Sequence, residues 1–407
     1  MVRINRPLHP KIALKLMSLP RLSICLITRD EAARLPGCLA SLAPLNAELN
    51  VVDTGSTDDT VALARDAGAE VIETTWTNDF SAARNLGIAR ATGTWILAID
   101  ADEQLTLDAV TALNRLTRQP ANRAHELIQR SRLPNGEELD VAIVRLFPRH
   151  PQVRFERPIH EQVNTSLERA HLPIERAKIV INHFGYADPA SMPAKSKRNR
   201  RIIVAALAAD PEGDPHLRYF LAASYLDGDD YAGAAREYER CIAECASERP
   251  RLADAARVQA ALCYQKIADH DAMASHLPTE ITLFLHPTAA LLRGETLMAD
   301  GQSEEARGWF EFVLAADDRA YVPPVVVNPL RLRALNGLAD VWAHQGRKDV
   351  AIRILQLGVS LSESPQGFAG APLAERYRSL CAAVSRLAGQ RQNMPLESHA
   401  SRIVQVA

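Results

Sequence analysis

The sequence predicts an α/β domain with a parallel sheet, followed by an all-helical domain. Between residue 22 and about residue 116, short apolar runs alternate with helical patterns, which is typical of a parallel sheet wrapped by helices. From about residue 196 onward, nearly every segment has helical spacing and is rich in alanine. Within this second part, a fixed spacing of small and large residues recurs, which indicates an internal helical repeat.

Length and composition exclude several classes of protein. The chain has 407 residues, 47% of them hydrophobic, which is enough for two or three domains. Its net charge of −2 predicts no nucleic-acid partner and no general affinity for anionic membranes. The six cysteines form no C-x-x-C pair, so we expect reduced thiols and a cytoplasmic location. No apolar stretch is long enough to span a bilayer, and residues 1–17 lack the pattern of a signal peptide.

The first part of the chain reads as alternating strands and helices. Strands are expected at residues 22–27, 49–53, 70–73 and 95–99, with helices at 32–42, after residue 56 and at 80–91. Ser56 is the expected N-cap of the middle helix, with Asp59 in its first turn, and Gly68 ends that helix.

After residue 116 the pattern changes to longer strands. Strands are expected at 125–131 and 139–147, joined through the turn Pro134-Asn135-Gly136, and a further strand is expected at 175–182. The short connections in the first part favour a parallel sheet, whereas this turn favours an antiparallel pair.

Acidic residues follow two of the expected strands. Asp53 ends the strand at 49–53, and Asp100 and Asp102 follow the strand at 95–99. The carboxyl ends of parallel strands meet at one edge of the sheet, where open α/β sheets bind ligands. If the backbone stays extended, Asp100 and Asp102 leave the same face and can share a hard divalent cation. The alternative is a surface turn after a buried strand.

The phosphate-binding motifs of other nucleotide folds are missing. No Gly-x-Gly-x-x-Gly follows the first strand, which disfavours a dinucleotide site, and no Gly-Lys-Ser/Thr occurs, which excludes a P-loop. An acid at a strand end, such as Asp53, can accept hydrogen bonds from a ribose or a base. A nucleotide bound at this edge would need its diphosphate neutralised, and a metal at Asp100 and Asp102 would supply that charge.

Three motifs resemble those of family 2 glycosyltransferases, which have the GT-A fold. They are V-V-D-T-G-S-T-D-D-T, D-F-S-A-A-R-N-L-G-I-A-R-A-T-G and W-I-L-A-I-D-A-D-E, preceded by L-S-I-C-L-I-T-R-D-E. The resemblance extends over residues 22–201. It is strongest to the subgroup with a tetratricopeptide domain, which includes peptide S-glycosyltransferases and relatives of lipopolysaccharide-core glucosyltransferases. It implies a nucleotide-sugar donor and a divalent metal, Mn²⁺ or Mg²⁺, but not the sugar or the acceptor.

The resemblance implies roles in donor binding. Asp53 corresponds to the residue that reads the uracil or ribose, and Thr28 and Glu31 lie in the loop that wraps the base. Arg84 and Asn85 match an R-N pair near the donor, where a guanidinium can also pair with phosphate. The alternative for this pair is an ordinary surface helix.

The resemblance also implies a metal site. Asp102 is the expected direct ligand, and Asp100 is expected to contact either the metal or the ribose. His183, in H-F-G-Y, is the expected third ligand, oriented by a neighbouring side chain. A lone histidine is more often structural. The basic residues 195–201 either contact phosphate or form the solvated first turn of a linking helix.

The segment P-I-H-E-Q-V matches the position of the family's catalytic base and assigns that role to Glu161. An inverting transfer is a single in-line displacement, so one base is sufficient. His160 is a competing base, because the unperturbed pKa of histidine lies closer to neutrality. The alternative is a structural His-Glu pair at the end of a strand.

The helical part has the spacing of tetratricopeptide repeats. Small residues at Ala222, Gly294 and Ala339 are followed after twelve positions by alanine and after sixteen by a larger residue. The alanines are Ala234, Ala306 and Ala351; the larger residues are Tyr238, Phe310 and Leu355; and Tyr225, Leu297 and Trp342 stand three positions after the small residues. A degenerate unit fits around Ala260 and Ala272. Such arrays offer a concave surface for a peptide or a partner protein, although an ordinary helical bundle is the alternative.

The sequence therefore predicts a GT-A domain at residues 18–195 and a tetratricopeptide-like domain at 196–388, between an N-terminal extension (1–17) and a C-terminal tail (389–407). The expected function is inverting, metal-assisted sugar transfer from a nucleotide-sugar to a hydroxyl or thiol, with a UDP-sugar as the expected donor. Two alternatives stay open. One is a sugar-phosphate nucleotidyltransferase, which would need a Gly-rich loop that T-R-D-E-A-A-R lacks. The other is a non-catalytic protein-binding scaffold built on the helical repeats.

Overall fold

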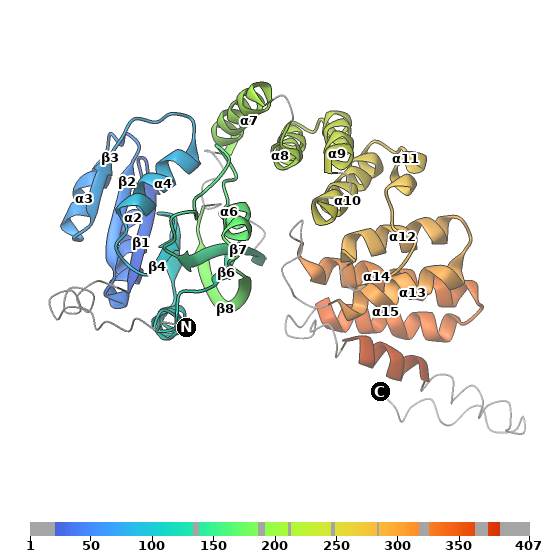
Figure 1. Cartoon of the computed structure of the whole chain (residues 1–407). Helices are drawn as coiled ribbons and strands as arrows, with labels where there is room; N and C mark the ends of the chain where they lie inside the picture. Colours follow the sequence, from blue (N-terminus) through green and yellow to red (C-terminus); the bar gives the residue numbers. More distant parts are fainter. Residues whose placement is uncertain are drawn as a thin grey trace, which may run out of the picture. The chain divides into compact units, whose positions relative to one another are not determined.

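The computed structural model describes residues 21–132, 138–185, 192–210, 213–245, 249–282, 285–316, 325–362 and 373–382 (Figure 1). The chain divides into two compact units, one up to Ala256 and one from Arg257. Within the described residues, the first unit holds a mixed eight-stranded sheet and several helices, and the second is helical. The expected order, an α/β domain followed by an all-helical region, is confirmed. The domain boundaries expected at 17/18, 195/196 and 388/389 stay predictions.

Four strands form the parallel part of the sheet. They are β1 (Leu22–Thr28), β2 (Glu48–Asp53), β3 (Glu70–Glu73) and β4 (Trp95–Ala98), in the spatial order β3-β2-β1-β4. Helices α2 (Leu35–Leu42), α3 (Thr60–Asp66) and α4 (Phe80–Arg90) connect them, with the short 3-10 helix η1 (Ala43–Leu45) before β2. Alternate residues of β1 enter separate cores, Leu26 on one face and Cys25 on the other, because successive strand side chains point to opposite faces. Both faces are covered, as the continuous apolar runs predict.

The other four strands make the sheet mixed. β7 (Glu138–Pro148) pairs antiparallel with β4 and with β6 (Ala124–Arg132), while β8 (Ile174–His183) pairs parallel with β6 and antiparallel with β5 (Glu103–Leu105). Helices α5 (Leu107–Leu116) and α6 (Asn164–Arg169) complete this part. The strands expected at 125–131, 139–147 and 175–182 are confirmed, whereas the expected Pro-Asn-Gly turn lies outside the described residues.

Strand register brings the predicted site residues to one edge of the sheet. Thr28 lies opposite Asp53 in the β1–β2 pair, and Asp100 follows shortly after β4, the other neighbour of β1. His183 at the end of β8 lies opposite Glu103 in β5 and opposite Ser131 in β6. The carboxyl ends of several strands therefore converge, as expected for a ligand-binding edge.

One predicted helix start is wrong. The N-cap of α3 is Asp59 and the helix begins at Thr60, so Ser56 lies outside it. Ser56 instead donates its hydroxyl to Asp53, three positions earlier, and accepts the backbone N–H of the distant Asp30. These two bonds replace the capping bond. The other end agrees with the prediction, since Gly68 follows the helix with φ of 83°.

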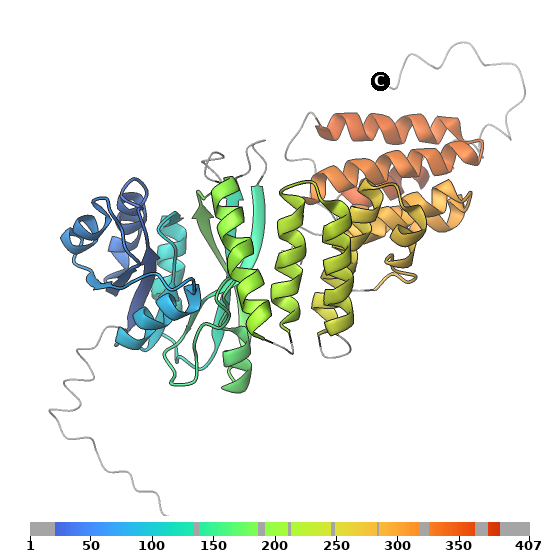
Figure 2. The same ribbon diagram turned by 90° about the horizontal axis from the view of Figure 1, so that it is seen from above.

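The helical region begins with α7 (Met192–Ala209), α8 (Pro215–Leu226) and α9 (Tyr231–Cys245), which stand side by side in chain order (Figure 2). The helix α10 (Pro250–Lys266) contains the division between the two compact units. The second unit contains α11 (His270–Ser275), α12 (Pro287–Ala299), α13 (Ser303–Ala315), α14 (Val327–His344) and α15 (Lys348–Ser362). Asp214 and Asp269 cap α8 and α11 by accepting backbone N–H groups of the first turn.

The repeat spacing correctly predicts where helices pack closely. Phe310 of α13 is fully buried between Gly294 of α12 and Gly337 of α14, at which a Cβ would lie 2.7 and 2.5 Å from its ring atoms. Ala234, Ala306 and Ala351 are buried, as the pattern requires. Leu355 was expected in the groove, but its side chain is 45% exposed, because the buried face of α15 runs through Ile354 instead.

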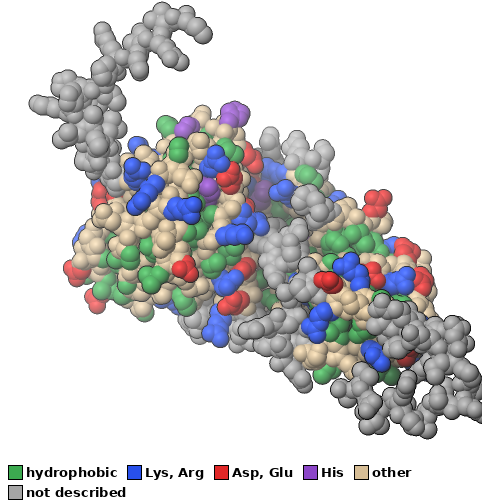
Figure 3. Space-filling model, turned by 90° about the horizontal axis from the view of Figure 1, so that it is seen from below, with side chains coloured by type: hydrophobic (Ala, Val, Ile, Leu, Met, Phe, Trp, Pro, Cys, Tyr) green, Lys and Arg blue, Asp and Glu red, His purple; other side chains and the backbone are tan. Residues whose placement is uncertain are grey.

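Surface and thiol chemistry agree with the composition. In the part of the chain that the structure describes, no helix is both long and apolar enough to cross a bilayer. All six cysteines are free thiols. On the face seen in Figure 3, basic, acidic and apolar side chains are interspersed, in keeping with the net charge of −2.

The packing around Phe310 generates a stability prediction. We expect Gly337→Ala to destabilise the second unit by about 1–3 kcal/mol through overpacking, which exceeds the gain in helix propensity of about 1 kcal/mol. The ring of Phe310 has no room to move, since Gly294 lies close on another side. Thermal unfolding measures the change. Gly308→Ala on α13 is the matched control, because nothing lies within 4 Å of its added Cβ; equal or higher stability in Gly337→Ala would contradict the packing argument.

Candidate active site

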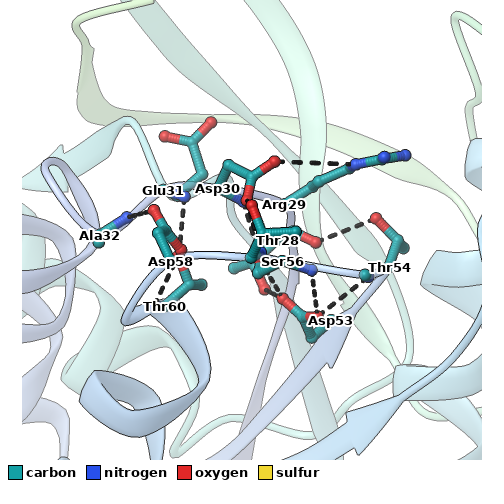
Figure 4. A network of polar contacts seen from close by, with 12 residues as sticks. Thr28, Arg29, Asp30, Glu31, Ala32, Asp53, Thr54, Ser56, Asp58 and Thr60 are labelled. Carbon is teal, nitrogen blue, oxygen red and sulfur yellow. Dashed lines mark hydrogen bonds and ion pairs between the residues drawn. The ribbon is translucent and has the colours of Figure 1, made fainter.

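Asp53 joins the loops that follow β1 and β2 (Figure 4). Its Oδ1 accepts the backbone N–H groups of Gly55 and Ser56 at 3.0 and 2.8 Å, and its Oδ2 accepts the hydroxyls of Thr28 and Ser56 at 3.1 and 2.5 Å. The side chain is only 3% exposed. Asp53 and Thr28, both predicted to contact the donor, therefore use their side chains on each other and on the loop backbone.

Further contacts fix the loop after β1 against the loop after β2. Asp30 has φ of 54° and accepts the backbone N–H of Thr57 at 2.7 Å. The backbone N–H of Glu31 donates to the hydroxyl of Thr60, and that of Ala32 to Asp58 (Figure 4). These bonds do not use the Glu31 carboxylate, which contacts Arg34 at 3.3 Å. These hydrogen bonds join the two loops into one surface at the position predicted for the nucleoside.

Glu31 also lies in the electrostatic field of the D-A-D motif. Burial raises the pKa of Glu31, a hydrogen bond from Arg34 lowers it, and the nearby Asp102 carboxylate raises it further. The structure therefore brings Glu31 and Asp102 to the same region, as the shared edge of the sheet predicts.

Arg84 of α4 links two of the predicted site residues. Its Nη2 donates to Asp100 Oδ1 at 2.7 Å, and its Nε donates to Glu161 Oε1 at 2.5 Å. The guanidinium is buried and also packs on the ring of Phe155. Arg84, Asp100 and Glu161 thus form one cluster, although 77 positions separate Arg84 from Glu161.

A second arginine completes this buried cluster. Arg145 of β7 donates through Nη2 to Asp100 Oδ2 at 2.7 Å and to Glu103 Oε1 at 2.8 Å. Glu103 is fully buried and accepts the backbone N–H of Asp100 through its other oxygen. Arg145 and Glu103 therefore hold the turn between β4 and β5 through both the side chain and the backbone N–H of Asp100.

The charges in this cluster fix the ionisation of Asp100. Burial alone would raise the pKa of Asp100, but Arg145 and Arg84 outweigh it, so this pKa lies well below its usual range. Burial raises the pKa of Glu103, only partly offset by Arg145. An ionised Asp100 held by two arginines has both carboxylate oxygens occupied.

The backbone of the D-A-D-E motif is not extended, contrary to the assumption that placed Asp100 and Asp102 on one face. A turn at Ala101 and Asp102 separates β4 from β5. The backbone N–H of Glu103 closes it by donating to the carbonyl of Asp100 at 3.0 Å. Asp100 consequently points to the arginines, whereas Asp102 meets His183. The two carboxylates therefore contact different neighbours.

Asp102 and His183 form a pair at the edge of the sheet. His183 Nε2 lies 3.5 Å from Asp102 Oδ2, and His183 Nδ1 lies 2.8 Å from the hydroxyl of Ser131. The backbone N–H of Phe184 donates to the carbonyl of Asp102 at 2.9 Å. The described residues contain no group of three or more His, Cys, Asp or Glu side chains arranged as a metal site. Asp102 and His183 are thus a pair rather than part of a larger cluster of such side chains within the described residues.

Gly185 packs closely against this pair. A Cβ at position 185 would lie only 2.4 Å from His183 Nε2 and 2.7 Å from Asp102 Oδ2. Any other residue would place its side chain against both of these atoms. Glycine is therefore required for this close approach of the backbone.

Glu161 and His160 point to different neighbours. The carboxylate of Glu161 meets Arg84, while the ring of His160 stacks on Phe220 of α8 with centroids 3.5 Å apart and an interplanar angle of 8°. Burial lowers the pKa of His160 to about 4. His160 is therefore neutral near pH 7 but is a weak base, so the adjacent positions are not equivalent.

Asn85 does not point toward the other predicted donor residues. Its side-chain amide donates to the carbonyl of Phe155 at 3.0 Å and accepts the N–H of Phe155 at 2.9 Å. This pair of bonds attaches α4 to the start of the segment that carries Glu161. Arg84 and Asn85 thus fix that segment from adjacent positions of one helix.

Sequence reasoning missed Arg145, Ser131 and Gly185. Arg145 and Ser131 lie on long strands whose local pattern does not reveal which partner their side chains meet. Glu103 was visible as the third acid of D-A-D-E, but its burial follows from its contact with Arg145. Gly185 was part of the H-F-G-Y motif, where a glycine beside a proposed ligand was the available signal.

Comparison with known sequences supports the expected family. Residues 23–122 match the model of the family described as glycosyl transferase family 2. A TPR repeat-containing protein of Synechococcus elongatus is 40% identical over 226 residues, which are 54% of this chain and 56% of that protein. The SPbeta prophage-derived glycosyltransferase SunS of Bacillus subtilis is 28% identical over 49% of this chain and 48% of its own length. The chain thus spans about half the length of these curated relatives.

Solved structures with a similar arrangement have low sequence identity. S. aureus TarS 1-349 in complex with UDP-GlcNAc is 15% identical, with a TM-score of 0.39, over 63% of this chain and 90% of that one. The mannosyltransferase PcManGT from Pyrobaculum calidifontis, in complex with GDP-Man and Mn²⁺, is 18% identical, with a TM-score of 0.37, over 69% of this chain and 84% of that one.

The burial of His160 predicts a pH dependence of stability. In the unfolded chain His160 binds a proton below about pH 6.5, whereas in the folded protein it does so only below about pH 4. Lowering the pH through this window therefore favours unfolding, by up to about 3 kcal/mol from this residue. We expect His160→Phe, which preserves a ring against Phe220, to remove this part of the acid sensitivity in denaturant unfolding between pH 7 and pH 4.5.

The matched control is His171→Phe. His171 has a similar backbone conformation, with φ of 52° against 51° for His160, but its side chain is exposed. It should leave the pH dependence of unfolding as in the wild type. Identical acid sensitivity in wild type and His160→Phe would show that His160 is not held neutral by burial.

Proposed function

We propose, on the premise that residues 23–122 form a family 2 glycosyl transferase domain, that this protein is an inverting, metal-assisted glycosyltransferase. It would move a sugar from a nucleoside diphosphate sugar, with UDP-sugars as the first candidates, to an acceptor hydroxyl or thiol. The observation that carries the proposal is the Asp102–His183 pair at the same edge of the sheet as the Arg84–Glu161 contact. A metal-binding pair and a positioned carboxylate are the groups that this chemistry requires.

Asp102 and His183 are the proposed metal ligands. Their donor types fit Mn²⁺ or Mg²⁺, which take few protein ligands and complete their coordination with phosphate oxygens and water. Ser131 contacts the other ring nitrogen of His183 and would fix the orientation of the ring. Gly185 places no side chain against the two donor atoms, whereas any Cβ at this position would contact both. A bound metal would neutralise the charge that develops on the leaving diphosphate. We do not propose Asp100 as a ligand, because Arg84 and Arg145 occupy both of its oxygens.

The donor nucleoside is proposed to lie on the joined loops after β1 and β2. Asp53 and Thr28 would act mainly by fixing the conformation of these loops, since their side chains bond to each other and to the loop backbone. The Glu31 carboxylate lies outside that network and is available for a ribose or base contact. In Arg84, the buried Nη1 has no hydrogen-bond partner within the described residues and is the donor we propose for a phosphate or acceptor oxygen.

Glu161 is the proposed general base. Its carboxylate is only partly buried and is oriented by Arg84, so it can accept the acceptor's proton while it remains fixed in space. His160 is the weaker candidate, because its ring is buried against Phe220 and does not contact Arg84.

The metal proposal predicts a loss of nucleotide affinity. We expect wild-type protein to bind UDP more tightly with Mn²⁺ than with EDTA, measured by calorimetry, and we expect Asp102→Asn to lose about 10- to 100-fold of the Mn²⁺-dependent affinity. Asp108→Asn, the same change at an exposed position of α5, is the control and should bind like wild type. Equal affinity of wild type with and without metal would refute the metal site; if GDP binds and UDP does not, only the choice of nucleotide changes.

The base proposal predicts a separate effect on turnover. We expect Glu161→Gln to lower the kcat for sugar transfer, or for donor hydrolysis where the acceptor is unknown, by roughly 10²- to 10⁴-fold, while donor affinity changes little. A thermal-shift screen of nucleotide-sugars identifies the donor first, since a bound donor stabilises the fold. Glu168→Gln at an exposed position of α6 is the control. Full activity in Glu161→Gln would exclude this residue as the base.

A further inference from the structure

The residues from Glu156 to Gln162 form a closed loop that presents Glu161. An isolated antiparallel bridge joins its ends: the N–H of Glu156 donates to the carbonyl of Gln162 at 3.0 Å, and the N–H of Gln162 donates back at 3.3 Å. Within the loop, Arg157 and His160 have φ of 79° and 51°. Residues other than glycine rarely adopt this conformation and keep it only where their surroundings fix it.

One of these surroundings is the start of helix α8. Arg157 donates through Nε to Asp214 Oδ2 at 2.6 Å, and its Nη2 lies 3.1 Å from His216 Nδ1. Asp214 is the N-cap of α8, and its other oxygen accepts the N–H of His216. Arg249 reaches the same Asp214 at 3.5 Å. The first strained position of the loop is therefore tied to the end of a helix through a largely buried ion pair.

The second attachment lies further along the same helix. The His160 ring stacks on Phe220, and Ile159 packs in a buried cluster with Leu217 and Leu221. Positions 217, 220 and 221 have the spacing of one helix face. Consecutive loop side chains thus pack on α8, whereas the next one, Glu161, meets Arg84.

The opposite side of the loop meets α4, the helix that carries Arg84. The carbonyl of Pro158 accepts the N–H of Phe80, the first residue of α4, at 2.8 Å. Phe80 also contributes to the cluster around Ile159. The loop is consequently clamped between α4 and α8, which lie within one compact unit (Figure 2).

We infer that helix α8 of the helical region is a positioning element for Glu161, which it acts on through Phe220 against His160 and through Asp214 against Arg157. This inference rests on the proposed role of Glu161 as the base. Phe220 and Asp214 touch neither donor nor acceptor in this scheme; they determine where the carboxylate stands relative to the acceptor. A positioned base loses much of its effect when it shifts by about 1 Å.

The test compares Phe220→Ala with Phe220→Tyr and with Phe312→Ala. Phe312 is a partly buried phenylalanine of α13 in the second unit, and thus a matched control for loss of an aromatic side chain. Phe220→Ala is expected to lower the kcat for donor turnover by roughly 10- to 100-fold and to leave Mn²⁺-dependent UDP affinity within about twofold. Phe220→Tyr, which retains the stacked ring, should restore the kcat. Phe312→Ala should affect neither.

A double-mutant cycle separates positioning from general damage. In the Glu161→Gln background, Phe220→Ala should lower the kcat no further, because the group that it positions is already missing. Independent effects of the two changes on kcat, or a parallel loss of UDP affinity in Phe220→Ala, would overturn the inference.

Hydrogen exchange provides a readout that does not depend on the proposed function. Faster amide exchange at Glu156 and Gln162 is expected in Phe220→Ala and not in Phe312→Ala, since the bridge between these residues would open more often. Unchanged exchange would overturn the inference. If wild-type protein turns over no nucleotide-sugar, the proposed function fails, and the exchange rates still decide whether α8 holds the loop.

Discussion

The site depends on the ion pairs that the buried guanidinium of Arg84 forms. It joins Asp100, next to β4, to Glu161 in a distant loop, while Asn85 attaches the same helix to Phe155. Arg145 and Glu103 balance the charge around Asp100 from the antiparallel part of the sheet. A buried charge of this kind is tolerated only when it is paired, so loss of one partner would leave others uncompensated. The cluster therefore specifies one arrangement of three chain segments rather than simply adding stability.

The second constraint is the strand register, which divides labour between the two aspartates. Pairing of β8 with β5 and β6 places His183 between Glu103 and Ser131, close to the turn that carries Asp102. The same turn directs Asp100 toward the arginines. A one-residue slip would reverse the face of His183 and separate it from Asp102. Backbone geometry thus places the proposed metal ligand and the charge-balancing carboxylate at neighbouring positions.

Local patterns predicted much of this molecule. The apolar runs predicted the strands, and the acids at strand ends predicted the edge where the site residues lie. Both predictions depend only on residues that are close in sequence. The side-chain partners were not accessible in this way. Arg145 and Ser131 acquire their contacts only through long-range pairing, and Ser56 is not the helix cap because it bonds to Asp53 and to the distant Asp30 instead. Asn85 belonged to a recognisable motif, yet its contact with Phe155 is structural.

The change from strands to helices in the sequence does not mark the end of the first compact unit; the packing does. The first compact unit continues to Ala256, well beyond the start of α7, and the contacts of the loop around Glu161 give a physical reason. That loop contains two residues in left-handed conformations, which need external support, and α8 supplies it through Asp214 and Phe220. A fragment that ends at residue 195 would lack these partners. The helices after the sheet are thus two kinds of element: those that complete the site, and those whose packing around Phe310 forms a separate core.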